Sequence, residues 1–134
     1  MRTLSAVVLF PVCLLAAFAA GTISVAQPPS SSVTLTRNGQ PTATIVLANE
    51  PTRAAQFAAY ELQWHLKQIT GADFSIVKED QPVQGLPILV GDSRRVRAVG
   101  IHADRLKKQQ YSIRVSPTAV VLAGRDKDDR GIVE

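Results

Sequence analysis

EPTRAAQFAAYELQWHLKQITG, Glu50 to Gly71, is the stretch that decides the fold, because it is long and periodic enough to predict a helix without help from its neighbours. Its apolar residues recur at spacings of three and four, which is typical of a helix with one buried face. The predicted buried stripe consists of Ala55, Ala58, Leu62, Leu66 and Ile69, with Phe57, Tyr60 and Trp64 on its shoulders.

The same stretch carries its own start and stop signals. Asn49 or Thr52 can cap the first turn, and Pro51 suits that turn because its missing N–H would have no partner there. Gly71 can take the left-handed conformation that ends many helices. Alanines concentrated in the first half predict close packing on a flat surface, which we expect the neighbouring strands to supply.

Strand patterns lie on both sides of the predicted helix. Before it, residues 33–37 and 42–47 alternate apolar and polar around Asn38-Gly39, a strong hairpin signal. After it, residues 74–77 alternate in the same way. Residues 87–91 are almost all apolar, which is typical of a central strand covered on both faces.

The rest of the chain completes the predicted sheet. Residues 94–100 and 103–108 predict short helical turns, and residues 111–115 and 119–123 form a second hairpin turned through Ser116-Pro117-Thr118. We therefore expect an α/β fold, a two-layer sandwich. In it, one main helix packs on one face of a mixed β-sheet of about five or six strands.

The first residues predict export. Arg2 precedes an apolar run over residues 4–20, and small residues follow at Ser24-Val25-Ala26, as a signal peptidase requires. A retained membrane anchor is the alternative, but the run is short of the roughly 20 apolar residues of a bilayer span. We interpret residues 1–26 as a signal peptide and expect a secreted or periplasmic protein without membrane attachment after cleavage.

Domain boundaries and excluded chemistries follow from that interpretation. Residues 27–32 are a Pro/Ser linker, and residues 33–134 are enough for one small domain. The single cysteine, Cys13, leaves with the signal peptide. The exported chain then has no disulfide, thiol nucleophile or zinc–thiolate site.

The charge is mildly positive, with 15 Lys and Arg against 11 Asp and Glu. Two short basic groups could bind an acidic ligand such as an acidic polysaccharide, although a solvated surface is the simpler interpretation. No aromatic residues interleave with these charges, so we expect no nucleic-acid partner. The candidate ligand-binding residues are Arg94, Arg95, Arg97, Lys107 and Lys108.

No residue pattern points firmly to catalysis. Glu61 is a candidate carboxyl group, but a helix-flank glutamate paired with Arg or Lys is the simpler account. Gly91-Asp92-Ser93 follows an apolar strand, where open sheets often bind ligands, but no Gly-rich phosphate loop accompanies it. His65 and His102 have no partner at catalytic spacing. Asp126, Asp128 and Asp129 lack the pattern of a calcium loop, so we predict no catalytic residue, metal or cofactor.

The end of the chain predicts an incomplete sandwich. Residues 124–131 form a polar loop, and residues 132–134 resemble the first turn of a helix that would cover the sheet beside the first helix. Without it, part of one sheet face would expose Val, Ile and Leu side chains, at roughly 1.5–3 kcal/mol for each large side chain. We therefore expect a domain truncated at its C-terminal helix that is marginally stable or forms a homodimer through this sheet face.

A series of short motifs runs from about residue 33 to the last residue. They are TRAAQFAAYELQ at 52–63, ITGA at 69–72, ILVG at 88–91, YSI at 111–113, LAG at 122–124 and DRG at 129–131. In order and spacing these motifs resemble the N-terminal domain of secreted α-glucuronidases of glycoside hydrolase family 67. They are similar also to the accessory domain that precedes the barrel of family 20 β-N-acetylhexosaminidases.

The resemblance implies an α/β sandwich that carries no catalytic residue, with the chemistry in a following (β/α)8 barrel. That barrel lies outside this chain, so no catalytic position is carried over. The resulting prediction is a non-catalytic accessory domain of a carbohydrate-degrading enzyme. The alternatives are a freestanding secreted binding module for acidic glycans and a small hydrolase in its own right.

Overall fold

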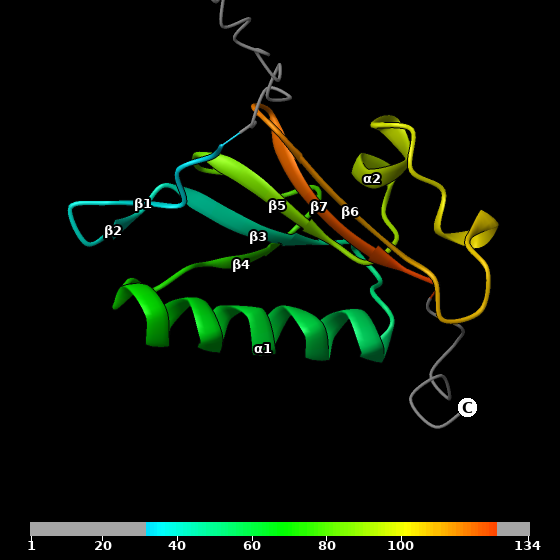
Figure 1. The fold of residues 1–134 in the computed structure, drawn as a ribbon, viewed down its shortest axis with the longest axis horizontal. Coiled ribbons are helices and arrows are strands. Elements are labelled where there is room, and N and C mark those ends of the chain that lie inside the picture. Colours follow the sequence, from blue (N-terminus) through cyan, green and yellow to red (C-terminus); the bar gives the residue numbers. More distant parts are fainter. Residues whose placement is uncertain (1–31, 126–134) are drawn as a thin grey trace, which may run out of the picture.

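The computed structural model describes residues 32–125, and these form one sheet with helices on both sides. The main helix, α1, spans Arg53–Thr70 and lies along one side of the sheet, whereas the short helix α2, Arg94–Ala98, lies on the other (Figure 1). The expected α/β architecture is therefore confirmed: a five-stranded mixed sheet with one main helix packed against it.

The predicted cap and stop of α1 act as expected, whereas Pro51 lies before the N-cap and not in the first turn. The Thr52 hydroxyl accepts a hydrogen bond of 3.1 Å from the Ala55 N–H, so Thr52, and not Asn49, is the N-cap. Gly71 has φ 73° and donates its N–H to the Lys67 carbonyl at 2.8 Å. Glycine reaches this left-handed conformation without steric cost, which is why the helix ends there.

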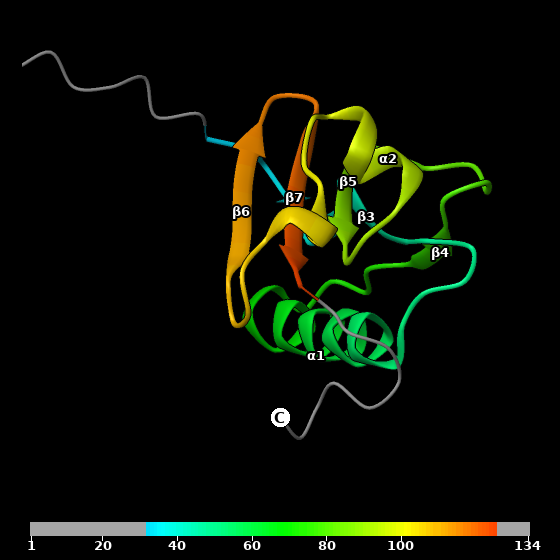
Figure 2. The ribbon, with the colours of Figure 1, turned by 90° about the vertical axis from the view of Figure 1, so that its right-hand side faces the viewer.

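The sheet has the order β4-β3-β5-β7-β6 (Figure 2). All neighbours are parallel except β6 and β7, which form the predicted second hairpin. The apolar strand at the centre and the parallel strand–helix–strand unit of β3, α1 and β4 both follow the sequence pattern. The strands are β3 at Ala43–Leu47, β4 at Ile76–Lys78, β5 at Leu86–Val90, β6 at Tyr111–Ser116 and β7 at Ala119–Gly124.

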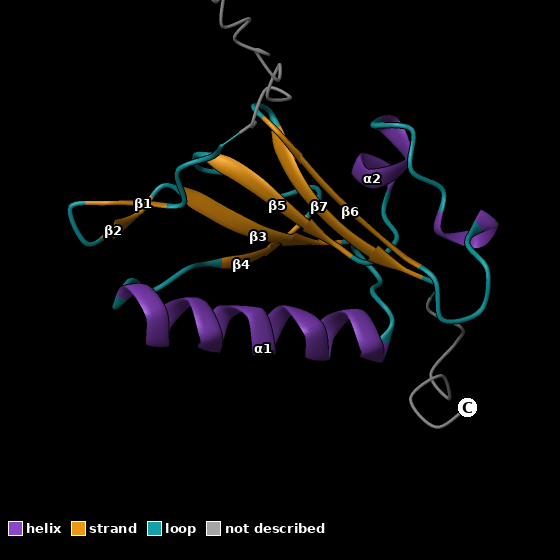
Figure 3. Cartoon of the chain, viewed as in Figure 1, coloured by secondary structure: helices purple, strands orange, loops and turns teal. Residues whose placement is uncertain are grey.

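The first predicted hairpin forms a small separate ribbon, β1 at Thr36–Arg37 and β2 at Gln40–Pro41 (Figure 3). Asn38 and Gly39 both have positive φ, 52° and 74°, as the tight turn between twisted strands requires. The chain then continues from β2 into β3, so only the second arm of this hairpin reaches the main sheet.

Two apolar clusters lie on the two faces of the sheet. Beneath α1, Ile45 and Ile88 pack with Ala55, Ala59 and Phe74. On the opposite face, the second cluster includes Val96 of α2 and Ile101, which lies just before the 3₁₀ helix η1, Ala103–Arg105. Its buried members are Val46, Leu89, Val96, Ile101, Ala119, Val121 and Ala123. The segment after β5 thus covers the face that α1 leaves open.

The predicted stripe of α1 is wrong at two positions. Ala59 is fully buried where Ala58 was expected, and Ile69 is 79% exposed. The reason is the placement of α1, which makes its main contacts with β3 and β5. Phe57, Tyr60 and Trp64, expected at the shoulders, are also exposed.

The part of the α1 face formed by β6 is uncovered among the described residues. Tyr111, Ile113 and Val115 of β6 are exposed, although they share a face with the half-buried Val120 and Leu122 of β7. This agrees with the expectation of an exposed apolar strip beside the first helix.

Several expectations lie outside the described residues. These are the signal peptide and nearly all of the linker, and the acidic loop with the helical turn after it. Within residues 32–125, no helix has the length and apolar character needed to cross a bilayer.

Candidate functional site

The carboxyl ends of the parallel strands bring most of the predicted site residues together. β4 ends at Lys78 and is followed by Glu79, whereas β5 ends at Val90 and is followed by Gly91-Asp92-Ser93 and α2. Open α/β sheets generally bind ligands at this edge. The two predicted features, the turn after β5 and the arginines of α2, therefore belong to one candidate site.

Glu79 is the buried carboxylate of this edge, with only 7% of its surface exposed. Its Oε1 accepts a 3.2 Å hydrogen bond from Arg94 Nε, and its Oε2 accepts one of 3.3 Å from the Arg95 N–H. Arg95 Nε also donates to the Glu79 carbonyl oxygen at 2.9 Å. The residue thus ties the end of β4 to the first turn of α2, and sequence reasoning did not single it out.

These partners control the ionisation of Glu79. Burial by itself raises the pKa of the carboxyl group, but the hydrogen bond from the Arg94 side chain and that from the Arg95 N–H lower it more strongly. The net result is a pKa below the ordinary value of 4.5. Glu79 is therefore an anion at neutral pH and does not act as a proton donor.

Asp92 and Arg97 form a second ion pair on the same turn. Arg97 Nε donates to Asp92 Oδ1 at 3.0 Å and Arg97 Nη2 to Oδ2 at 2.6 Å, the fork geometry that guanidinium and carboxylate favour. The hydrogen bonds that Arg97 donates to the Asp92 carboxylate raise the pKa of Arg97. Ser93 caps α2 through its hydroxyl, which accepts from the Val96 N–H at 3.1 Å.

A shallow hollow of about 320 Å³ lies beside these pairs, lined by Glu79, Arg94, Arg95 and Ala98. Arg94 is well exposed there, with 71% of its side chain open to solvent. An acidic group could approach the hollow, but it would compete with Glu79 for the guanidinium of Arg94. Arg94 and Arg97 thus serve first to neutralise carboxylates of their own chain, whereas the Arg95 side chain binds a backbone carbonyl.

The two predicted lysines lie elsewhere along the chain. Lys107 and Lys108 follow η1 in the loop that leads to β6, and both are exposed. Within residues 32–125 the structure gives no contact between these lysines and the arginines of α2. The five basic residues therefore form two groups: the arginines, whose side chains bond to Glu79 or Asp92, and the exposed lysines.

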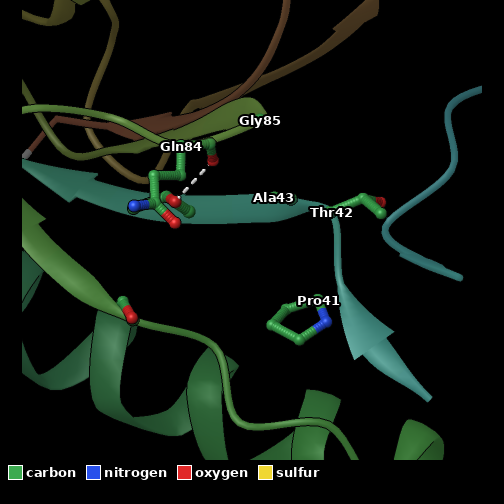
Figure 4. Close-up of a pocket in the computed structure, with 7 residues that line it drawn as sticks. Pro41, Thr42, Ala43, Gln84 and Gly85 are labelled. Carbon is green, nitrogen blue, oxygen red and sulfur yellow. Dashed lines mark hydrogen bonds between the residues drawn. The ribbon is translucent and has the colours of Figure 1, made fainter.

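A second hollow, of about 300 Å³, lies at the other end of the parallel strands, where β3 and β5 begin (Figure 4). It is lined by Pro41, Thr42, Ala43, Thr44, Ser75, Gln84 and Gly85, none of them charged. The Thr44 hydroxyl donates to the Gln84 carbonyl at 2.7 Å. This hollow was not predicted from the sequence. The one sequence feature that points to it is Gly85, which directly precedes the apolar strand β5.

Gly85 allows the close approach that shapes this hollow. Its φ is 69°, and a Cβ atom there would lie 2.1 Å from the Thr42 carbonyl oxygen. The same oxygen accepts the Leu86 N–H at 2.9 Å. The start of β5 can therefore reach β3 only with glycine at this position, and the hollow is explained as a packing feature.

The predicted catalytic candidates lie on the open surface. Glu61 pairs with His65 at 3.8 Å, so its partner is a histidine and not the expected Arg or Lys. His65 also contacts the Trp64 ring edge-on, with 4.8 Å between the two ring centroids. Both side chains are more than half exposed, and no described hollow adjoins them. His102 precedes η1 without capping it.

Neither a metal site among the described residues nor a similarity to known proteins assigns a function to this chain. Among residues 32–125 there is no group of three His, Cys, Asp or Glu side chains that could hold a metal ion. The chain matches no protein-family model, and neither curated proteins nor solved structures show a significant similarity to it.

Proposed function

We propose that this chain is a non-catalytic N-terminal accessory domain of a secreted glycoside hydrolase of the α-glucuronidase type. The observation that carries the non-catalytic part of the proposal is the state of Glu79, the one carboxylate buried among residues 32–125. Glycoside hydrolysis needs a pair of carboxyl groups of which one has a raised pKa. The pKa of Glu79 is lowered instead, and its oxygens accept hydrogen bonds from Arg94 and Arg95.

The placement of the motifs behind the family resemblance also supports the proposal. Thr52 caps α1, Gly71 ends it, and residues 88–90 form part of the central strand β5. These residues build the fold and line neither hollow. Motifs with purely architectural roles are what an accessory domain would share with its relatives.

The proposal is tested first on the coding sequence and then on the protein. We expect the reading frame beyond Glu134 to continue into an amphipathic helix and a (β/α)8 barrel. We also expect the purified chain to release no sugar from glucuronoxylan oligomers or aryl glycosides. A stop codon directly after Glu134, or release of sugar that is lost in a Glu79→Gln variant, would contradict the proposal.

Export is the second part of the proposal. N-terminal sequencing of the protein recovered from the periplasm or medium should begin close to Gln27. Recovery of a chain that still starts at Met1 in the membrane fraction would favour the retained anchor.

A binding module for acidic glycans is the competing function, and the hollow beside the exposed Arg94 favours it. Calorimetric titration with glucuronate-containing oligosaccharides separates the two functions. Saturable binding that is weakened in an Arg94→Ala variant would favour the module, whereas the accessory-domain proposal predicts no saturable heat.

A further inference from the structure

β6 is the least protected edge of the sheet. It is the last strand in the order β4-β3-β5-β7-β6, and within residues 32–125 no strand pairs with its outer side. It runs without a bulge from Tyr111 to Ser116, each residue in register with one of β7. A regular edge strand of this length presents a row of backbone donors and acceptors to a further strand.

The other edge strand, β4, is better protected against pairing with a further strand. β4 has only three residues and ends on Lys78, and a short strand with a terminal charge is a common way to block pairing. β6 is twice as long, contains no proline and carries one charged residue, Arg114. The guanidinium of Arg114 donates to the Val99 carbonyl at 2.7 Å, so it is held on the α2 side.

The opposite face of β6 is apolar and open. Tyr111, Ile113 and Val115 are 71%, 63% and 39% exposed. They pair with Gly124, Leu122 and Val120 of β7, which places them on the face that α1 covers further along the sheet. An exposed edge and an exposed apolar strip thus coincide on one strand.

The pattern of β6 suits pairing with a copy of itself. In an antiparallel pair of identical strands, the numbers of any two opposite residues add up to the same value. If this value is even, opposite side chains lie on the same face of both copies, as a twofold axis perpendicular to the sheet requires. Centred on Ile113, this register sets Ile113 opposite its own copy and Tyr111 opposite Val115. On the other face it sets Ser112 opposite Arg114, so no like charges meet across the strands.

The charges at the strand ends are compatible with the same register. Lys107 and Lys108 precede β6, and Pro117 and Thr118 follow it. In an antiparallel pair the basic end of one strand therefore approaches the uncharged turn of the other. A register centred on Arg114 would instead set two arginines opposite each other, which disfavours it.

We propose that two copies of this chain associate through antiparallel pairing of their β6 strands, centred on Ile113, to form one continuous sheet. The dimer goes beyond the accessory-domain function and concerns the chain of 134 residues, because the helix that the accessory-domain proposal expects beyond Glu134 would compete with a second copy for the apolar strip of β6. The apolar side chains of the two copies then form one strip across the twofold axis. A second copy satisfies both features at once, because it supplies an edge strand and a matching apolar face.

The experiment is sedimentation equilibrium of the full chain over a range of micromolar concentrations. We expect a monomer–dimer equilibrium for the native chain. Ile113→Lys and Ile113→Glu should each lower the association constant by about tenfold or more, because each sets two like charges opposite each other. An equimolar mixture of the two variants should recover dimers, because opposite charges then face each other.

Phe57→Lys is the matched control, since Phe57 is 62% exposed on α1 and lies off β6. It should leave the association constant unchanged. A native chain that stays monomeric would overturn the proposal and indicate that another segment or a different protein covers β6. Dimers that survive both Ile113 substitutions, or two monomeric variants whose mixture does not associate, would also overturn it. None of these three outcomes bears on whether the chain releases sugar.

Discussion

Arg94 Nε lies 3.2 Å from Glu79 Oε1, and this contact joins the end of β4 to the first turn of α2. The carboxylate is buried, whereas the arginine side chain is largely exposed. A carboxylate in such a place needs its partners, because burial without them would cost more than the charge contributes. The contact therefore gives the buried carboxylate a charged partner from α2.

Replacing Glu79 by glutamine should destabilise the protein. The neutral amide cannot balance the charge of Arg94. Its nitrogen is a hydrogen-bond donor, and it would face another donor, either Arg94 Nε or the Arg95 N–H. We expect a loss of about 1–2 kcal/mol, less than the roughly 3–5 kcal/mol of a fully buried pair, because solvent screens Arg94. Urea unfolding followed by circular dichroism measures it.

Asp73→Asn provides the control for that variant. Asp73 pairs with Lys67 across 2.5 Å, but both side chains are more than half exposed. Loss of this surface pair should change the free energy of unfolding by less than about 0.5 kcal/mol. Equal effects of the two substitutions would show that the burial of Glu79 has no energetic weight.

The contribution of Glu79 should depend on pH in one direction. Its pKa in the folded protein is lower than the ordinary 4.5, so the unfolded chain binds the proton more readily. The stabilisation is complete above pH 4.5 and declines as the pH falls through the lower pKa of the folded state. The difference in unfolding free energy between the native chain and Glu79→Gln should therefore shrink in acid, as urea titrations at several pH values would reveal. A difference that grows in acid would contradict this sign.

Gly85→Ala should be among the most damaging small substitutions. The new methyl group would meet the Thr42 carbonyl 2.1 Å away, and alanine is disfavoured at φ 69°. We expect a loss of about 2 kcal/mol or more, measured by thermal or urea unfolding. Gly39→Ala is the comparison, because Gly39 has a similar φ of 74° but no atom within 4 Å of the added Cβ. It should cost only about 1 kcal/mol, and the difference isolates the close approach of β5 to β3.

Thr52→Ala should weaken the start of α1. The substitution removes the hydroxyl that accepts the Ala55 N–H, a loss of roughly 1 kcal/mol for an N-cap. Thr52→Ser should restore most of it. Asn49→Ala should have almost no effect, because Asn49 is exposed and lies outside the cap. Hydrogen exchange at the first turn of α1 would detect the same ranking, and a larger effect at Asn49 would contradict the cap assignment.

The local structure of this chain could be predicted from its sequence because local interactions decide it. The spacing of apolar residues along α1, the hydroxyl of Thr52 and the conformational freedom of Gly71 act within a few residues of each other. The same holds for the Asn38-Gly39 turn, whose two residues accept positive φ. The α/β class followed from these elements, since a helix between two strands leaves few other arrangements.

What the tertiary structure decided is which side of each element has a neighbour. Ala59 is buried and Ile69 exposed because α1 packs on β3 and β5, a placement that helical periodicity does not contain. Glu79 and Arg94, fifteen positions apart, meet because two parallel strands end at one edge. The open strip of Tyr111, Ile113 and Val115 has the same origin: alternation predicts two faces for a strand, but only the packing of the whole sheet determines which of them stays uncovered.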